Sequence, residues 1–121
     1  MDKQQAFYKL WSMFNIPAYD ENSVPDDATF PRIDYQVMTD SIDSPVFPIA
    51  KLWYRNTSWT AVDAKLNEIA SYIEEMLPIS LDNGYMNVTP GTPFAQRMTA
   101  EDDPTIKGYL INLSVEFFTK N

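Results

Sequence analysis

The stretch KGYLINLSVEFFT, residues Lys107–Thr119, decides the fold, because an apolar residue recurs in it at every second position. Successive side chains of a strand point to opposite faces of a sheet, so this spacing is typical of a long strand. So long an apolar face is expected at the centre of a sheet, covered by helices. The residues of this face are Tyr109, Ile111, Leu113, Val115 and Phe117.

Two segments have the helical spacing of apolar residues. Phe7, Leu10, Trp11 and Phe14 follow i, i+3, i+4, i+7, which predicts a helix over about residues 3–15 that ends before Pro17. A second helix is predicted over about residues 59–76. Its expected buried stripe is Val62, Leu66, Ile69, Ile73 and Met76, and its expected solvated residues are Asp63, Lys65, Asn67, Glu68 and Glu74.

The start of the second helix offers two caps. Ser58 is expected to cap it, and Thr60 with Asp63 forms a competing capping pair. Hydroxyl and carboxylate oxygens at these positions accept hydrogen bonds from the free amides of the first helical turn.

Other segments indicate strands and turns. Strands are predicted over residues 32–39, 46–55 and 85–89, with Pro48 at an edge or a bulge. Residues 94–98 either pair with the strand 85–89 or begin a loop. Residues 18–31 read as a surface loop, and turns are expected at 40–45, 82–84, 90–93 and 101–104.

This order of elements predicts one α+β domain over residues 1–121. We expect a largely antiparallel sheet with two main helices packed on one face. The N-terminal helix (about 3–15) and the surface loop (about 18–31) precede a strand-strand-helix-strands core over about 32–119.

Composition excludes several classes of protein. The chain has no cysteine and no histidine, so disulfides, thiol catalysis and imidazole catalysis or ligation are absent. Its net charge of -8, with the nine basic residues scattered singly, opposes specific nucleic-acid binding. No apolar run is long enough for a bilayer, and the first residues lack a secretory signal pattern, so we expect no membrane association.

Carboxylates are the remaining candidates for chemistry. They cluster at Asp26–Asp27, Asp40 with Asp43, Glu74–Glu75 and Glu101–Asp103. Nearly all of these fall in expected loops or at helix ends, which is typical of solvated or capping carboxylates. We therefore expect no catalytic residues, no metal, no cofactor and no enzymatic activity.

The aromatic residues suggest a contact surface. Trp53, Tyr54 and Trp59 lie close together in sequence, and Phe117 and Phe118 must point to opposite faces of a strand. Either the sheet and helices cover all of them, or one of each group is exposed to a partner.

Three stretches together carry a resemblance. Residues 85–98, YMNVTPGTPFAQRM, and above all Gly91–Met98, are similar to a segment of small tail proteins from phages and prophages of Gram-positive bacteria. The stretch Leu52–Ile73 resembles a strand and helix of the same family, and Tyr35–Asp40 agrees with it. The chain therefore resembles the tail terminator, or tail-to-head joining, proteins of tailed phages.

The resemblance implies a homo-oligomeric ring, generally a hexamer, at the head-proximal end of the tail of a virion assembled in the bacterial cytoplasm. Such a ring caps the tail tube protein, meets the head connector or stopper protein, and lets DNA pass without specific binding. The family also implies a small α+β domain. Candidate interface or channel-facing residues are Asp26, Asp27, Thr92, Phe94, Gln96, Arg97, Glu101, Asp102 and Asp103.

Three other functions remain open. A head-completion or stopper protein of the connector has a similar size and also forms a ring. A small hydrolase or nuclease would use a carboxylate-bound metal, although the missing histidine counts against it. A host-directed regulator would bind a host protein through exposed aromatic residues.

Overall fold

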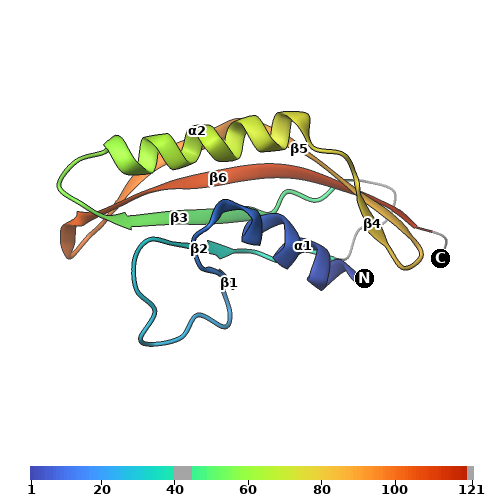
Figure 1. Cartoon of the computed structure of the whole chain (residues 1–121), viewed down its shortest axis with the longest axis horizontal. Coiled ribbons are helices and arrows are strands. Elements are labelled where there is room, and N and C mark those ends of the chain that lie inside the picture. The colour runs from blue at the N-terminus through green and yellow to red at the C-terminus, as the bar shows by residue number, and fades with distance from the viewer. Residues whose placement is uncertain (40–44, 120–121) are drawn as a thin grey trace.

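The computed structural model describes residues 1–39 and 45–119, which form a six-stranded sheet and two α-helices (Figure 1). The strand order is β1-β2-β3-β6-β5-β4, and only the β1–β2 pair is parallel. The predicted α+β class is thus confirmed.

The strands are β1 (Ala18–Asp20), β2 (Arg32–Tyr35), β3 (Ile49–Arg55), β4 (Ile79–Leu81), β5 (Gly84–Ala100) and β6 (Asp103–Thr119). The helices are α1 (Lys3–Trp11), a 3-10 turn η1 (Ser12–Phe14) and α2 (Thr60–Glu75).

Strand β6 occupies the centre of the sheet, as its apolar alternation predicts. It pairs with β3 on one side and with β5 on the other, so Ile111 lies opposite both Ala50 and Ala95. Its apolar face is buried: Ile111 and Val115 have no exposed surface. The same face of the neighbouring strands supplies Ile33, Leu52, Met86 and Val88 to the core.

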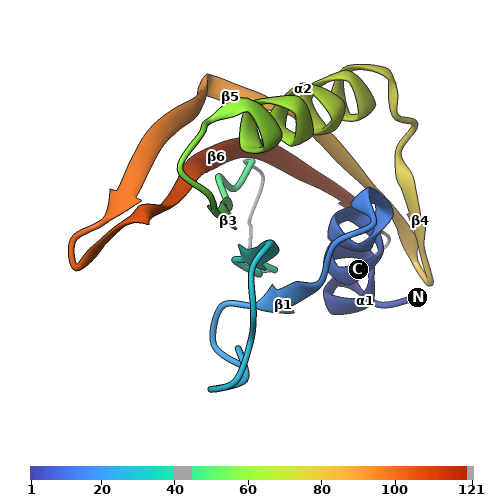
Figure 2. The ribbon, with the colours of Figure 1, turned by 60° about the vertical axis from the view of Figure 1, so that its left-hand side comes forward.

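Both helices pack on this face of the curled sheet, which Figure 2 shows from the side. In α1, Phe7, Leu10 and Trp11 are buried, and Phe14 in η1 completes the predicted stripe. Asp2 and Gln5 close the N-terminus of α1 as a reciprocal capping box. The helix-covered core therefore consists of apolar side chains from both helices and five strands.

Helix α2 follows its predicted bounds within one residue, but two predictions about it are wrong. Asp63 and Lys65 do not simply face water, because Asp63 bonds to the sheet and the Lys65 Nζ donates to the carbonyl of Phe14 at 2.7 Å. The capping predictions also fail: Trp59 occupies the N-cap without a side-chain bond, and Ser58 Oγ accepts instead from the first helical amide, that of Thr60.

The predicted surface loop 18–31 begins with a strand. Strand β1 runs parallel to β2, with the amide of Ile33 donating to the Pro17 carbonyl and that of Glu21 to the Tyr35 carbonyl. Three residues are too few to leave an alternating pattern in the sequence, so only the pairing reveals this strand.

The two strands after this loop are shorter than predicted. Strand β2 ends at Tyr35, and β3 begins at Ile49 because Pro48 has no amide to donate. Val46 still forms an isolated bridge with Val115. Residues 40–44 lie outside the described residues. They hold most of the turn predicted at 40–45, the Asp40 and Asp43 carboxylates, and the end of the Tyr35–Asp40 segment.

The largest correction concerns residues 84–100. The turn at Asp82–Asn83 is confirmed, but an unpredicted strand, β4, precedes it. The turn predicted at 90–93 is wrong, because β5 is one strand of 17 residues. Pro90 lies opposite Leu113, and Ala95 lies opposite Ile111. Residues 91–94 of β5 therefore face a single residue of β6, Asn112, and form a bulge. A bulge absorbs extra residues without ending the pairing.

No helix within the described residues is long and apolar enough to cross a membrane.

Candidate functional site

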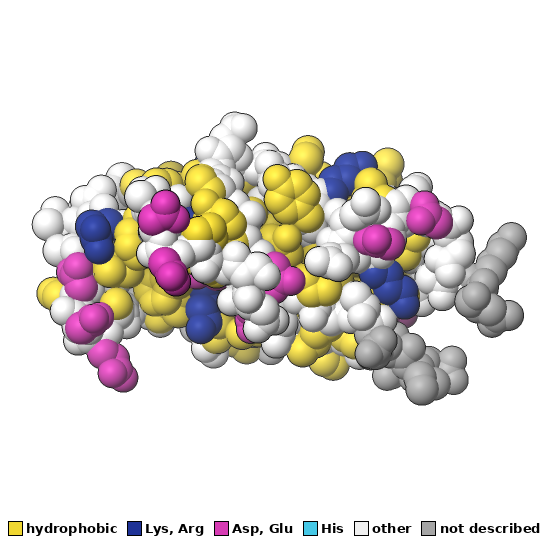
Figure 3. All heavy atoms as spheres, turned by 90° about the horizontal axis from the view of Figure 1, so that it is seen from below, with side chains coloured by type: hydrophobic (Ala, Val, Ile, Leu, Met, Phe, Trp, Pro, Cys, Tyr) yellow, Lys and Arg dark blue, Asp and Glu magenta, His cyan; other side chains and the backbone are white. Residues whose placement is uncertain are grey.

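Two acidic segments that are distant in sequence lie at one end of the molecule. The loop that carries Asp26 and Asp27 and the β5–β6 turn that carries Glu101 and Asp102 both lie at the left-hand end in Figure 1. All four of these residues are exposed. Figure 3, seen from below, shows several acidic side chains toward this end and others farther along the molecule. We call this region, residues 21–31 and 101–103, the acidic end.

Arg55 at the end of β3 joins the two segments of the acidic end. Its guanidinium lies 4.9 Å from the centre of the Phe30 ring and forms a 3.8 Å ion pair with Asp103. The guanidinium of Arg32 also lies near this ring, 4.6 Å from its centre, and is paired at 3.0 Å with the buried Asp34. Contacts of one aromatic ring with two cations thus fix the loop to the sheet.

Asp103 differs from the other predicted channel residues. Its Oδ1 accepts bonds from the Thr105 amide at 2.9 Å and the Thr105 hydroxyl at 2.6 Å. These two bonds lower the pKa of Asp103, with smaller lowering effects of Arg55 and Lys107. Asp103 therefore shapes the start of β6, and its charge is partly compensated. Asp26, Asp27, Glu101 and Asp102 supply the uncompensated charge.

Arg97 belongs to a polar cluster under α2. It lies opposite Tyr109, whose hydroxyl accepts from Arg97 Nε at 3.0 Å and donates to Asp63 Oδ1 at 2.5 Å. Its Nη2 reaches Asp63 Oδ2 at 3.3 Å, and its guanidinium lies 4.2 Å from the centre of the Trp59 ring. We call Trp59, Asp63, Arg97 and Tyr109 the α2 clasp.

The α2 clasp is a structural tie rather than a set of reactive groups. Burial and the bond to Asp63 raise the pKa of Tyr109, so its hydroxyl keeps its proton. The bonds with Tyr109 and Asp63 raise the pKa of Arg97. Nothing in the sequence pairs these residues, because they come from a helix and two strands and have no motif spacing.

The other predicted residues of β5 lie in or beside its bulge. Thr92 and Gln96 are exposed, whereas Phe94 is half-buried against the core. The Asn112 amide group donates to the Pro93 carbonyl at 3.0 Å and holds the bulge in place. The candidate residues thus fall into the acidic end and a separate bulge region, with Arg97 in the α2 clasp.

The sheet face opposite the helices, which we call the open face, carries half-buried apolar side chains. Trp53, Gly108 and Met98 form one row across three strands, and Leu110 lies in the next row. A Cβ on Gly108 would lie 2.9 Å from Cε3 of Trp53, so the glycine makes room for the indole. Of the three aromatic residues that lie close together in sequence, Trp53 is therefore on the open face, while Tyr54 and Trp59 pack against the core.

The end of the sheet opposite the acidic end carries further aromatic residues. Phe117 packs edge-on against Phe7, whereas Phe118 is 45% exposed and stacks on Tyr85, with ring centres 4.9 Å apart. The predicted opposite orientation of the two phenylalanines is confirmed. Phe47 is even more exposed, at 62%.

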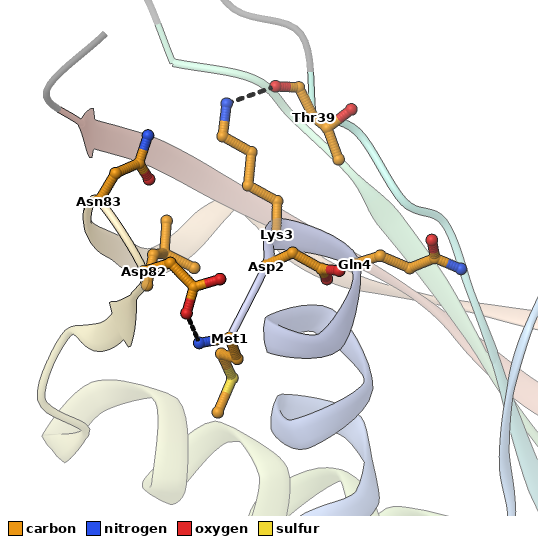
Figure 4. A pocket seen from close by; sticks show the side chains of 8 residues that line it. Met1, Asp2, Lys3, Gln4, Thr39, Asp82 and Asn83 are labelled. Carbon is orange, nitrogen blue, oxygen red and sulfur yellow. Dashed lines mark hydrogen bonds and ion pairs between the residues drawn. The ribbon is translucent and has the colours of Figure 1, made fainter.

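A shallow hollow also lies at this opposite end, between the start of α1 and the β4–β5 turn (Figure 4). The Met1 amine contacts Asp82 Oδ1 at 2.5 Å, and Lys3 Nζ donates to the Thr39 carbonyl at 3.0 Å. These charged groups bond to each other or to the backbone. The hollow thus offers no converging set of reactive side chains.

Within residues 1–39 and 45–119, no three carboxylates come together in a group that could hold a metal ion. What the arrangement provides is two exposed acidic segments toward one end and an open face that carries half-buried apolar side chains. No protein-family model, no curated protein and no solved structure matches the chain.

Proposed function

We propose that this protein is a tail terminator of a phage, a ring-forming structural protein that caps the finished tail tube and joins it to the head connector. The similarity of residues 85–98 and 52–73 to small phage tail proteins supports this proposal. The observation that carries it is the acidic end, where two segments distant in sequence are joined through Arg55 and expose uncompensated carboxylates on a small α+β domain.

In such a ring the acidic end of each copy faces the channel. Six copies carry six times -8, a formal charge of -48. A negative channel wall repels phosphates, so DNA slides through it without adhering. The position of these charges suits this role, because two loops toward one end of the domain expose all four of them: Asp26, Asp27, Glu101 and Asp102.

The open face suits contacts with neighbouring subunits. Trp53, Met98 and Leu110 are half-buried there within one chain. Tryptophan and methionine are enriched in protein interfaces. Burial of these side chains against the next copy or the tube would give the ring an apolar contact beside its charged channel.

Deletion of the gene from its phage, followed by electron microscopy of the lysate, tests the proposal. Tails of abnormal length beside unattached heads are expected. Tails of normal length beside emptied heads would identify a stopper of the connector instead. Intact, infectious particles would exclude a structural role and would favour the host-directed regulator instead.

A further inference from the structure

Within residues 1–39 and 45–119, no strand pairs with the outer edge of β5 over most of its length. Strand β4 pairs only with residues 84–86, and β6 takes the other side of β5. Beyond the bulge, residues 95–99 continue in regular register with β6. None of these five residues is buried, and Figure 2 shows no other strand along the outer side of this arm.

The direction of the backbone groups on this edge follows from the pairing on the far side of β6. The amides of Leu113 and Val115 donate toward Pro48 and Val46, so odd-numbered residues of β6 face β3. Even-numbered residues of β6 therefore face β5, because backbone groups alternate along an antiparallel strand. Their partners Gln96 and Met98 bond to β6. The amides and carbonyls of Ala95, Arg97 and Thr99 consequently point outward.

This edge lacks the usual protection against strand addition. It contains no proline between Ala95 and Thr99, and its single charged side chain, Arg97, is held by Asp63 in the α2 clasp. By contrast, the outer edge of β1 is only three residues long, and a turn occupies its last residue. There the Asp20 carbonyl accepts from the Ser23 amide at 2.9 Å, and its side chain accepts from the Asn22 amide.

The charge at the end of the edge indicates which strand fits. The edge runs directly into Glu101 and Asp102, which are exposed and have no ion-pair partner within the described residues. Among its described residues, a second copy of this chain offers the three-residue edges of β1 and β4 or the same acidic-ended β5 edge. A strand with a basic end complements the site better.

We propose that residues 95–99 of β5 bind an extended segment of another protein as an added antiparallel strand. A lysine or arginine of that segment lies beside Glu101 and Asp102. The backbone of Ala95, Arg97 and Thr99 supplies hydrogen bonds to the segment, which is the recognition mode of β-strand addition. This proposal stands on the free edge and does not depend on the role in a phage tail.

The free protein already allows a first test. Amide hydrogen exchange measured by NMR should alternate, fast at Ala95, Arg97 and Thr99 and slow at Gln96 and Met98. Uniform protection over residues 95–99 would mean that the edge is occupied or covered, and would overturn the proposal.

Binding is tested with a synthetic peptide, acetyl-KKTVTVT-amide, whose lysines reach the acidic turn when the peptide runs antiparallel to β5. Saturating peptide should slow exchange of the three outward amides about tenfold, as expected for new hydrogen bonds. The control peptide acetyl-EETVTVT-amide should bind at least about tenfold more weakly, because its charge matches that of the turn. Equal effects of both peptides, or none, would overturn the proposal.

Two variants locate the contact. Thr99→Pro removes an outward amide but no internal bond, and should weaken KKTVTVT binding about tenfold, whereas Thr99→Val keeps the amide and should bind within about twofold of the parent. Should the proline variant not fold, Glu101→Lys with Asp102→Lys should reverse the preference between the two peptides. Sedimentation that shows dimers of the parent and monomers of Thr99→Pro would assign the edge to a second copy and refute a foreign strand.

Discussion

The helix-covered core and the acidic end are held together by different forces. The core buries Phe7, Leu52 and Ile111 with no exposed surface, and its members among the described residues are apolar, with charges such as Asp63 and Lys65 at its margin. The acidic end is fixed by cation–ring contacts and one 3.8 Å ion pair around Arg55, all near solvent. Apolar burial contributes far more to stability than exposed ion pairs do. The comparison teaches that stability resides in one region while the other is free to carry function.

The largest effect is expected in the core. Phe7→Ala should lower the free energy of unfolding by about 3–5 kcal/mol, because a large buried ring is replaced by a cavity. Urea denaturation followed by tryptophan fluorescence measures this loss. The matched control is Tyr8→Ala on the exposed side of the same helix, where about 0.5 kcal/mol is expected. Similar losses in both variants would mean that α1 is not anchored through Phe7.

The second effect concerns the centre of the sheet. A Cβ on Gly108 would lie 2.1 Å from the Leu52 carbonyl oxygen, so Gly108→Ala must push β3 and β6 apart. We expect a loss of about 2–3 kcal/mol, which is typical of overpacking. Ser114→Ala on the same strand should change stability by only about 0.5 kcal/mol. If both variants unfold at the same urea concentration as the parent, the close β3–β6 approach is incorrect.

The α2 clasp should give an intermediate effect. Tyr109→Phe removes the hydroxyl between Asp63 and Arg97 and should cost about 1 kcal/mol at neutral pH. The raised pKa of Tyr109 means that the folded protein binds this proton more tightly than the unfolded chain. This contribution is complete below pH 10.0 and is lost as the pH rises through the folded-state pKa.

Unfolding measured from pH 7 to pH 11.5 tests the clasp. The parent should lose stability above about pH 10, and Tyr109→Phe should lose less. Part of the loss should remain in the variant, since burial also raises the pKa of Tyr35 and Tyr54. An identical alkaline loss in parent and variant would show that Tyr109 is not held by the clasp.

A smaller effect is expected at Asp103. Its lowered pKa means that the carboxylate favours the fold at pH values above the ordinary 3.8, and that this contribution is lost as the pH falls from 3.8 through the lowered folded-state pKa. Asp103→Asn should therefore be less stable than the parent at pH 7, and the difference should shrink as the pH falls below 3.8. Thermal unfolding measured from pH 7 into the acid range tests this, with Asp102→Asn, which changes the neighbouring exposed carboxylate, as the control.

The smallest effect on stability is predicted for the exposed carboxylates. Changing Asp26, Asp27, Glu101 and Asp102 together to their amides should shift stability by no more than about 0.5 kcal/mol. If the channel role is correct, the same variant should complement a gene deletion poorly, with complete particles that deliver DNA slowly. Glu74→Gln with Glu75→Gln removes charge elsewhere and should complement fully. If the fourfold variant is strongly destabilised, the acidic end contributes to stability, and the contrast with the core is wrong.

The regular parts of this fold could be predicted because apolar residues recur in them at fixed intervals. The alternation in Lys107–Thr119 and the helical spacing around Phe7 and Ile69 depend on burial of one face, which selects apolar residues at fixed intervals. Strands β1 and β4 have three residues each and leave no period. The bulge opposite Asn112 was not predicted, because two prolines and a glycine within four residues have the composition of a turn.

The candidate sites were predictable to a smaller extent. The carboxylates of the acidic end were identified as loop residues, but only the fold brings the two loops to one end. The contacts of Arg55 and those within the α2 clasp left no signal, because the partners lie far apart in the chain. Arg97 was identified through a resemblance, and its contacts with Tyr109 and Asp63 give it a structural role.

The central place of β6 has a consequence for synthesis of the protein. Strands β3 and β5 are made before β6 and share it as their only common neighbour in the sheet. While the ribosome is still translating the residues before Asp103, the nascent chain can form α2 and the β4–β5 hairpin, but not the sheet that both of them need. Assembly of the sheet must therefore wait for the last strand, which leaves apolar segments available to chaperones until then.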